Sequence, residues 1–243
     1  MSDQRTATLA NNYNAVRERV DKACARVGRD PEEVTLVAVS KTWPASDLQA
    51  LYDHGVRHFG ESYAQEWEEK APQLPDDVAW HFIGHLQSNK ARVIAGHTHL
   101  VHSVDRNSLI KELSKRSGQE GATSRVLLQV NVGEDENKSG VDTEEVFGLL
   151  EKATNREHLV VCGLMTIPPF EDDPEVNREN FRQLAALLEP CRAWLDERGL
   201  LEKHPFEEIS MGMSGDFEIA IEEGATLVRV GSAIFGSRTY SND

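Results

Sequence analysis

The chain has 243 residues, of which 39% are hydrophobic and 28% are charged, and its formal net charge is −15. This acidity argues against a nucleic-acid partner because phosphate backbones are bound by basic surfaces, and no stretch approaches the ~20 apolar residues that a membrane-spanning helix needs. The three cysteines lie far apart and fit neither a disulfide framework nor a CxxC metal site, which favours the cytoplasm. Because no exposed apolar stripe is evident, we expect a monomer.

Strands and helices alternate along the chain after an N-terminal helical pattern at residues 8–27, which ends at Gly28. Eight apolar runs are typical of strands, at residues 34–39, 56–59, 78–83, 100–104, 126–132, 159–164, 206–210 and 227–230. Their number and spacing match a (β/α)₈ barrel, whereas a doubly wound open sheet more often has fewer strands. We predict an α/β fold with a single TIM-type barrel domain over residues 1–243, in which residues 1–30 form an extra helix packed on the barrel.

Two of the predicted helices carry local signals. Ser62 and Gln65 form a capping-box pattern ahead of a helix at residues 64–70. Pro190 lies inside a long helical segment at residues 177–198. Since proline removes a helical hydrogen bond and clashes with the preceding turn, we expect a kink or a break there.

Lys41 follows the first predicted strand after a single serine. At the carboxyl end of a barrel strand a lysine amine can be partly desolvated, which lowers its pKa and frees a nucleophile for Schiff-base formation with a carbonyl. The alternative is a lysine that leaves the sheet and extends into water. Lys41 is therefore a candidate for Schiff-base formation, and the choice between the two interpretations depends on the residues around it.

Two short glycine-containing loops follow the seventh and eighth predicted strands, where phosphates often bind in barrels of this type. Gly212, Met213 and Ser214 lie in the first loop, and Gly231 and Ser232 in the second. Glycine lets the backbone approach an anion, helix-start N–H groups point at it, and serine adds a donor. The two loops together predict a phosphate cradle.

Arg229 lies within the eighth predicted strand, and strand alternation places it on one face with Leu227 and Gly231. An arginine inside a barrel must be paired or hydrogen-bonded, so one interpretation is a structural ion pair with a carboxylate such as Glu61. The other is a donor aimed at a ligand. An amine, a phosphate cradle and a buried arginine at one end of a barrel suit pyridoxal 5′-phosphate.

Histidines give no metal site from their spacing. His81 and His85 are separated as zinc ligands on a helix can be, but His81 lies in a strand-like run, so the pair would not converge. His97, His99 and His102 cluster around the fourth predicted strand, where packed or solvated imidazoles are the ordinary outcome. We predict no metal.

Nine sequence blocks resemble the pyridoxal phosphate homeostasis protein family, in the family's order and over nearly the whole chain. They are VAVSK ending at Lys41, HFGE at 58–61, WHFIG at 80–84, LQSNK at 86–90, HSVD at 102–105, KSG at 138–140, GLMTIP at 163–168, SMGMS at 210–214 and VRVGSAIFG at 228–236. The family is similar in fold to the amino-terminal barrel of alanine racemase.

The resemblance implies that Lys41 holds pyridoxal phosphate as a Schiff base and that Arg229 faces the pyridine nitrogen. It also implies that Ser214, Gly231 and Ser232 help to bind the phosphate. The family usually has asparagine where this chain has Ser62, so a contact from that position would come from a shorter donor.

The resemblance also implies a carrier or buffer that supplies the cofactor to other enzymes, with pyridoxal-phosphate-dependent apo-enzymes as partners and no established turnover. Carbanion chemistry needs an acid that keeps the pyridine nitrogen protonated, and an arginine cannot accept that proton. Two alternatives stay open. One is a small pyridoxal-phosphate-dependent racemase or lyase, and the other is a barrel isomerase or aldolase that joins Lys41 to a sugar phosphate.

Overall fold

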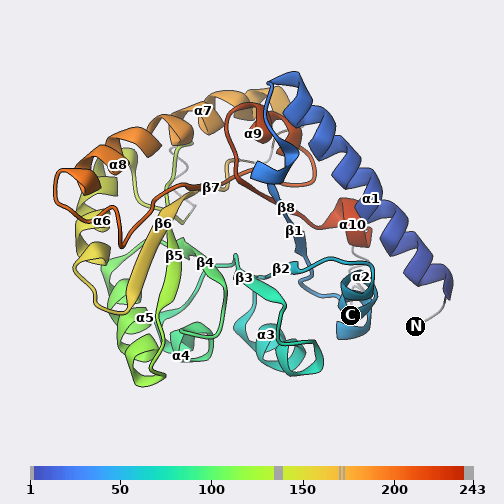
Figure 1. Ribbon diagram of the computed structural model, residues 1–243, viewed down its shortest axis with the longest axis horizontal. Helices are drawn as coiled ribbons and strands as arrows, with labels where there is room; N and C mark the ends of the chain where they lie inside the picture. The colour runs from blue at the N-terminus through green and yellow to red at the C-terminus, as the bar shows by residue number, and fades with distance from the viewer. Residues whose placement is uncertain (1–2, 134–138, 170, 172, 238–243) are drawn as a thin grey trace.

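Eight parallel strands close into a barrel in the order of the chain (Figure 1). The computed structural model describes residues 3–133, 139–169, 171 and 173–237. The strands are β1 (Thr35–Val39), β2 (His58–Glu61), β3 (Ala79–Phe82), β4 (Leu100–Val104), β5 (Ser124–Gln129), β6 (Leu159–Met165), β7 (Glu208–Ser210) and β8 (Leu227–Val230). β8 closes on β1 with Arg229 opposite Val37. The predicted (β/α)₈ barrel is confirmed.

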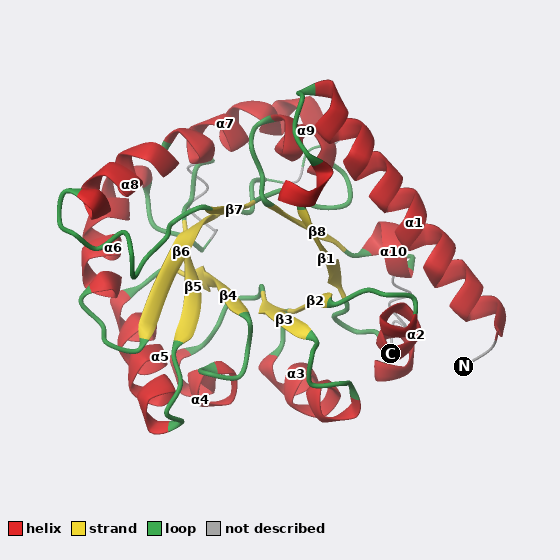
Figure 2. Cartoon of the chain, in the orientation of Figure 1, coloured by secondary structure: helices red, strands yellow, loops and turns green. Residues whose placement is uncertain are grey.

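Helices surround the strands, as the secondary-structure colours show (Figure 2). They are α1 (Asp3–Arg26), α2 (Ala45–Asp53), α3 (Ala64–Lys70), α4 (Ala91–Ile94), α5 (Asn107–Gln119), α6 (Val146–Thr154), α7 (Arg178–Ala186), α8 (Leu188–Asp196), α9 (Phe217–Glu222) and α10 (Ser232–Phe235). None of these described helices combines the length and the hydropathy that crossing a membrane requires.

The N-terminal helix α1 lies outside the barrel, along α9 and α10 (Figure 1). Its apolar face buries Leu9, Val16 and Val20. The Asn12 side-chain amide donates a hydrogen bond to the carbonyl oxygen of Ile234 over 2.9 Å, which fixes α1 against α10. The organisation of residues 1–243 as one domain stays a prediction.

Of the two local predictions for helices, the break near Pro190 is confirmed and the capping box at Ser62 is wrong. The long segment breaks at Leu187, between α7 and α8. This lies one turn before Pro190, where the proline ring would meet the carbonyl of Ala186, and the expected break is confirmed. The capping-box prediction is wrong, because Tyr63 is the N-cap of α3 and makes no side-chain capping bond.

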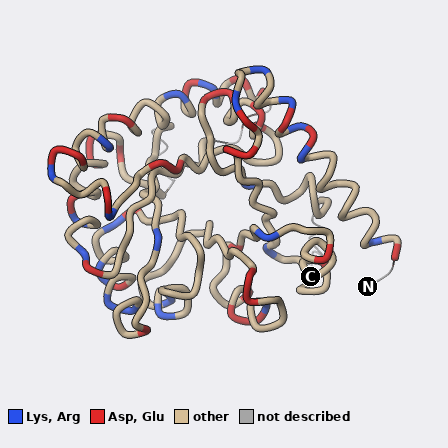
Figure 3. Tube along the Cα trace, in the orientation of Figure 1, with Lys and Arg blue, Asp and Glu red and all other residues tan. Residues whose placement is uncertain are grey.

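The strands separate two apolar regions. The larger lies between strands and helices and contains Val228 and Val230. A small cluster with Val37 and Leu227 lies on the face of the strands that carries Arg229. Charged residues lie mainly on the outer helices and loops, where they remain hydrated (Figure 3). The alternation predicted for β8 is confirmed, because Val228 and Val230 lie in the larger region and Leu227 lies in the small cluster.

Candidate functional site

A cavity of about 660 Å³ opens at the carboxyl ends of the strands. All seven residues predicted to bind a cofactor contribute to its wall, namely Lys41, Ser62, Met213, Ser214, Arg229, Gly231 and Ser232. These residues come from β8 and from the segments that follow β1, β2, β7 and β8, and barrel closure brings them together. Their binding roles stay a prediction, but their convergence on one cavity is a property of the fold.

The backbone on both sides of Lys41 is held by charged side chains from α3. The Lys70 amine donates to the carbonyl oxygen of Ser40 over 3.0 Å, while the N–H of Thr42 donates to Glu66 Oε2 over 2.7 Å. Lys70 also donates to that same oxygen of Glu66 over 2.7 Å. Because the residues before and after Lys41 are both tied to this network, the network holds the backbone at Lys41 in place.

Glu61 lies behind this network and is completely buried. Its Oε1 accepts hydrogen bonds from Lys70 over 2.8 Å and from the Ser40 hydroxyl over 2.7 Å. Burial raises the pKa of the Glu61 carboxyl above its ordinary value, and the Lys70 ammonium opposes that rise. The alternative in which Glu61 pairs with Arg229 is wrong, because Glu61 pairs with Lys70.

The loop after β7 forms one wall of the cavity. Gly212 adopts φ +88°, and a Cβ there would lie 2.8 Å from the Cα of Phe217, so only glycine fits. The Ser214 hydroxyl accepts hydrogen bonds from the N–H groups of Gly231, over 3.2 Å, and of Ala233, over 3.4 Å. Ser214 thus joins the two loops that the sequence predicts as a phosphate cradle.

Three backbone donors in these loops are unused within the described part of the chain. The N–H groups of Ser214, Gly215 and Ser232 make no hydrogen bond to any described residue. All three residues line the cavity. Backbone N–H groups gathered in short glycine-containing loops suit an anion such as a phosphate.

Arg229 is 3% exposed and belongs to the cavity wall. Its guanidinium donates to the Ser210 hydroxyl and, over 2.8 Å, to the carbonyl oxygen of Thr166. Burial lowers the pKa of Arg229 to about 10, while the Asp216 carboxylate acts in the opposite direction. The side chain therefore remains a cation at neutral pH, fixed by two hydrogen bonds and directed toward the cavity.

Asp216 and Asn177 also line the cavity, and the sequence analysis did not single them out. Asp216 accepts from the N–H of Met213 over 2.7 Å and from the Asn177 amide over 3.1 Å. The Asn177 amide also donates to the carbonyl oxygen of Pro169, at 3.2 Å. The position of Asp216 directly before α9 was the available signal, since aspartate often satisfies backbone donors at helix starts.

A hydrogen-bonded chain of imidazoles continues from Arg229 through the barrel. The Ser210 hydroxyl contacts His102 Nδ1 at 2.8 Å, and His102 Nε2 contacts His81 Nδ1 at 2.9 Å. His81 Nε2 contacts His58 Nδ1 at 2.9 Å. Burial lowers the pKa values of His81 and His102 well below the ordinary value, so both rings are neutral. His102 is thus packed, as expected, but it is also a link in a polar chain.

Comparisons with known proteins agree with this geometry. The alanine racemase N-terminal domain family matches residues 6–239. The pyridoxal phosphate homeostasis protein of Aquifex aeolicus is 42% identical over 226 residues, which are 93% of this chain and 96% of that protein. Its Escherichia coli K12 counterpart is 39% identical over 238 residues, 96% of this chain and 98% of that protein.

Among solved structures, PipY of Synechococcus elongatus with PLP bound has a TM-score of 0.78 and 33% identity to this chain. The match covers 94% of this chain and all of that protein, 100% of its length. The likeness therefore extends over nearly the whole chain.

Proposed function

Because the chain belongs to the pyridoxal phosphate homeostasis protein family, we propose that it binds pyridoxal 5′-phosphate in the cavity at the carboxyl ends of the strands. Its role would be that of a cytoplasmic, monomeric carrier that holds the cofactor and releases it to apo-enzymes. The single observation that supports this proposal most strongly is the convergence of Lys41, Arg229 and the two glycine-containing loops on one cavity.

The residues present suit the three reactive parts of this cofactor. The Lys41 amine would condense with the aldehyde, forming a C=N bond with loss of one water. The unused N–H groups of Ser214, Gly215 and Ser232 would donate to the phosphate oxygens. Arg229 would donate to the pyridine nitrogen, and Ser62 would contribute its shorter hydroxyl where the family has an asparagine amide.

The surroundings of Arg229 favour holding the cofactor over turning over a substrate. When bound, pyridoxal phosphate supplies an electron sink, which is strongest if its pyridine nitrogen is protonated. Arg229 is already a donor to Ser210 and Thr166 and cannot take up a further proton. The buried carboxylate in the wall, Asp216, accepts from Met213 and Asn177 and so fixes the loop. These contacts support a carrier.

A transfer experiment tests the proposal. The protein would be loaded with pyridoxal phosphate, freed of excess cofactor, and mixed with an apo-aminotransferase whose recovered activity is followed. We expect recovery of the aminotransferase as the carrier loses its bound chromophore, and neither effect with Lys41→Ala. The exposed Lys115 on α5 gives a matched control, because Lys115→Ala should behave as the unaltered chain does.

Loading without transfer, together with conversion of an added amino acid at a useful rate, would instead support the racemase or lyase. Failure to load at all would contradict cofactor binding and favour a sugar-phosphate barrel. Size-exclusion chromatography with light scattering would test the monomer.

A further inference from the structure

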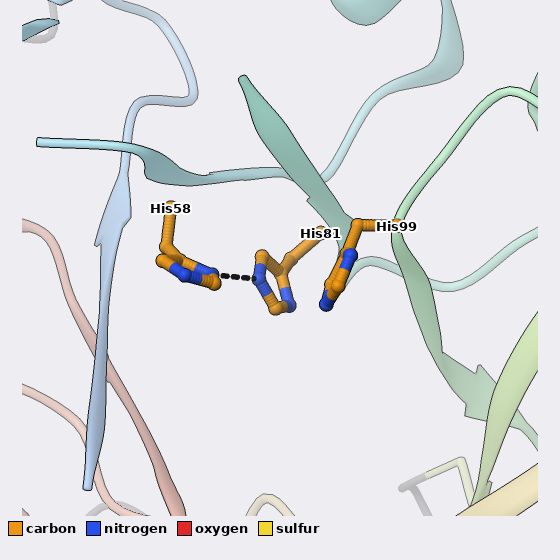
Figure 4. Close-up of side chains that lie close together, drawn as sticks. All are labelled: His58, His81 and His99. Carbon is orange, nitrogen blue, oxygen red and sulfur yellow. Dashed lines mark hydrogen bonds between the residues drawn. The ribbon is translucent and has the colours of Figure 1, made fainter. Parts of the chain in front are cut away.

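Three imidazoles gather near the amino ends of β2 and β4, and none of the three lines the cavity at the carboxyl ends. His58 is the first residue of β2, His81 lies within β3, and His99 directly precedes β4. One ring nitrogen from each lies within 4.8 Å of the other two. Figure 4 shows the three rings converging on one region from neighbouring strands. No sequence spacing connects these residues, so the cluster is created by closure of the barrel.

The separations of the rings are close to those of a metal site. The ring centroid of His81 lies 5.2 Å from that of His58 and 5.3 Å from that of His99. His58 Nδ1 lies 2.9 Å from His81 Nε2. Tetrahedral zinc with Zn–N bonds of about 2.0–2.1 Å places its nitrogen ligands about 3.3 Å apart. Small ring rotations would bring the three nitrogens to that separation.

The cluster has unused lone pairs and a supporting partner. Within the described chain neither ring nitrogen of His99 makes a hydrogen bond, and His58 uses only Nδ1 toward another imidazole. His81 is 1% exposed, and its Nδ1 contacts His102 Nε2. If His81 Nε2 bound a metal ion, Nδ1–H would donate to His102, which is the outer contact that metal-binding histidines generally make.

We infer that His58, His81 and His99 form a binding site for a divalent first-row transition ion of the zinc class, with water as the remaining ligand. Imidazole suits zinc, copper, nickel and cobalt, whereas magnesium and calcium prefer oxygen donors. His99 is exposed and His58 half-buried, so an ion and its water can enter from solvent. The inference does not depend on the proposed cofactor function.

One nearby charge opposes the ion. The Arg125 guanidinium on β5 acts electrostatically on both His81 and His99, and it is held by a hydrogen bond from Nε to Cys162 Sγ over 3.4 Å. A cation so close should weaken the affinity of the cluster for a metal ion. Arg125 also provides a variant that should raise the affinity, because Arg125→Met should bind the ion more tightly than the unaltered chain.

The experiment is a titration of the metal-free full chain with Co²⁺, whose visible bands report a tetrahedral site, followed by competition with Zn²⁺. We expect one equivalent to bind. His58→Ala and His99→Ala should each weaken binding by about 100-fold or more, since even loss of an outer partner costs about 10–100-fold. His97→Ala is the matched control, because His97 is another exposed histidine near β4 that lies outside the cluster.

Circular dichroism would verify that the variants fold. Zn²⁺ protection of His58 and His99 against diethylpyrocarbonate, with His97 still modified, gives a second readout on the unaltered chain. Absence of the cobalt bands, or bands that persist unchanged in both His58→Ala and His99→Ala, would overturn the assignment. So would modification of His58 and His99 that Zn²⁺ does not slow.

Discussion

At the carboxyl ends of the strands, Lys70 and Glu61 form a buried ion pair beside the cavity, whereas at the amino ends His58 and His81 share a hydrogen bond between neutral rings. The first arrangement holds a cation and a carboxylate in place through several hydrogen bonds each. In the second arrangement burial lowers the pKa of the imidazoles, so their nitrogen lone pairs stay unprotonated. Fixed cations and backbone donors suit an anionic ligand, whereas uncharged imidazoles suit a metal cation.

The two ends are joined by the chain from Arg229 through Ser210 and His102 to His81. Arginine has no acceptor, so the Ser210 oxygen must accept from Arg229. The imidazoles beyond it can donate in either direction along the chain. A metal ion on His81 Nε2 would fix His81 Nδ1–H as a donor to His102 and thereby set one direction.

The largest effect is expected from Lys70→Met, which removes the cationic partner of Glu61. Breaking a buried pair from one side leaves a carboxylate without compensation, and this destabilises proteins by about 3–5 kcal/mol. Chemical denaturation should show that the free energy of unfolding falls by that amount. Lys115→Met, on the exposed side of α5, should leave the free energy of unfolding nearly unchanged. Adding Glu61→Gln to Lys70→Met should restore part of the loss. A Lys70→Met variant as stable as the unaltered chain would mean that the network contributes little.

Acidification should destabilise the protein through the buried imidazole of His204. His204 is fully buried, and its Nδ1 accepts from the N–H of Val161 in β6 over 3.0 Å. Burial lowers the pKa of His204 to about 4, from an unfolded value near 6.5. The unfolded chain therefore binds a proton that the folded chain does not, and the stabilisation present above about pH 6.5 is lost as the pH falls toward 4.

The expected loss from this one group is about 3 kcal/mol in the free energy of unfolding. Urea unfolding across this pH range would measure it. His204→Gln, which keeps an acceptor for Val161, should flatten the dependence by about that amount. An identical pH dependence in the variant would rule His204 out as its source.

A smaller effect is expected at the loop after β7. Gly212→Ala would place a Cβ 2.6 Å from that of Ala220 at a backbone φ of +88°. Overpacking and strain of this kind cost about 1–3 kcal/mol. Gly215→Ala is the control in the same loop, since nothing lies within 4 Å of its added Cβ. Thermal unfolding should separate the two variants, and equal melting temperatures would contradict the close packing.

The sequence predicted the parts of the molecule that depend on short-range pattern. Alternating strands and helices indicated the barrel, and the position of Lys41 and Arg229 relative to their strands placed them at one end. Ser62 lines the cavity, and its contact with a cofactor stays a prediction. Its assignment to a capping box is wrong, because α3 begins one residue too late for its hydroxyl to cap.

What the sequence did not reveal depends on which strands become neighbours. Lys70 meets Glu61 and the Ser40 carbonyl only after α3 folds against β1 and β2. His58 and His81 lie in β2 and β3, His99 directly precedes β4, and the three meet only across the sheet. The regularly spaced pair of His81 and His85 does not form the cluster. Lys138, a family-motif residue, lies outside the described residues.

The most direct test of cofactor binding is a visible spectrum of the purified protein with pyridoxal phosphate, before and after borohydride, followed by peptide mapping. We predict a protein-bound absorbance that borohydride bleaches and a pyridoxyl group on the peptide that contains Lys41, with none in Lys41→Ala. A colourless protein after addition of the cofactor, or a pyridoxyl group on another lysine, would contradict the assignment of Lys41 and of the cavity around it.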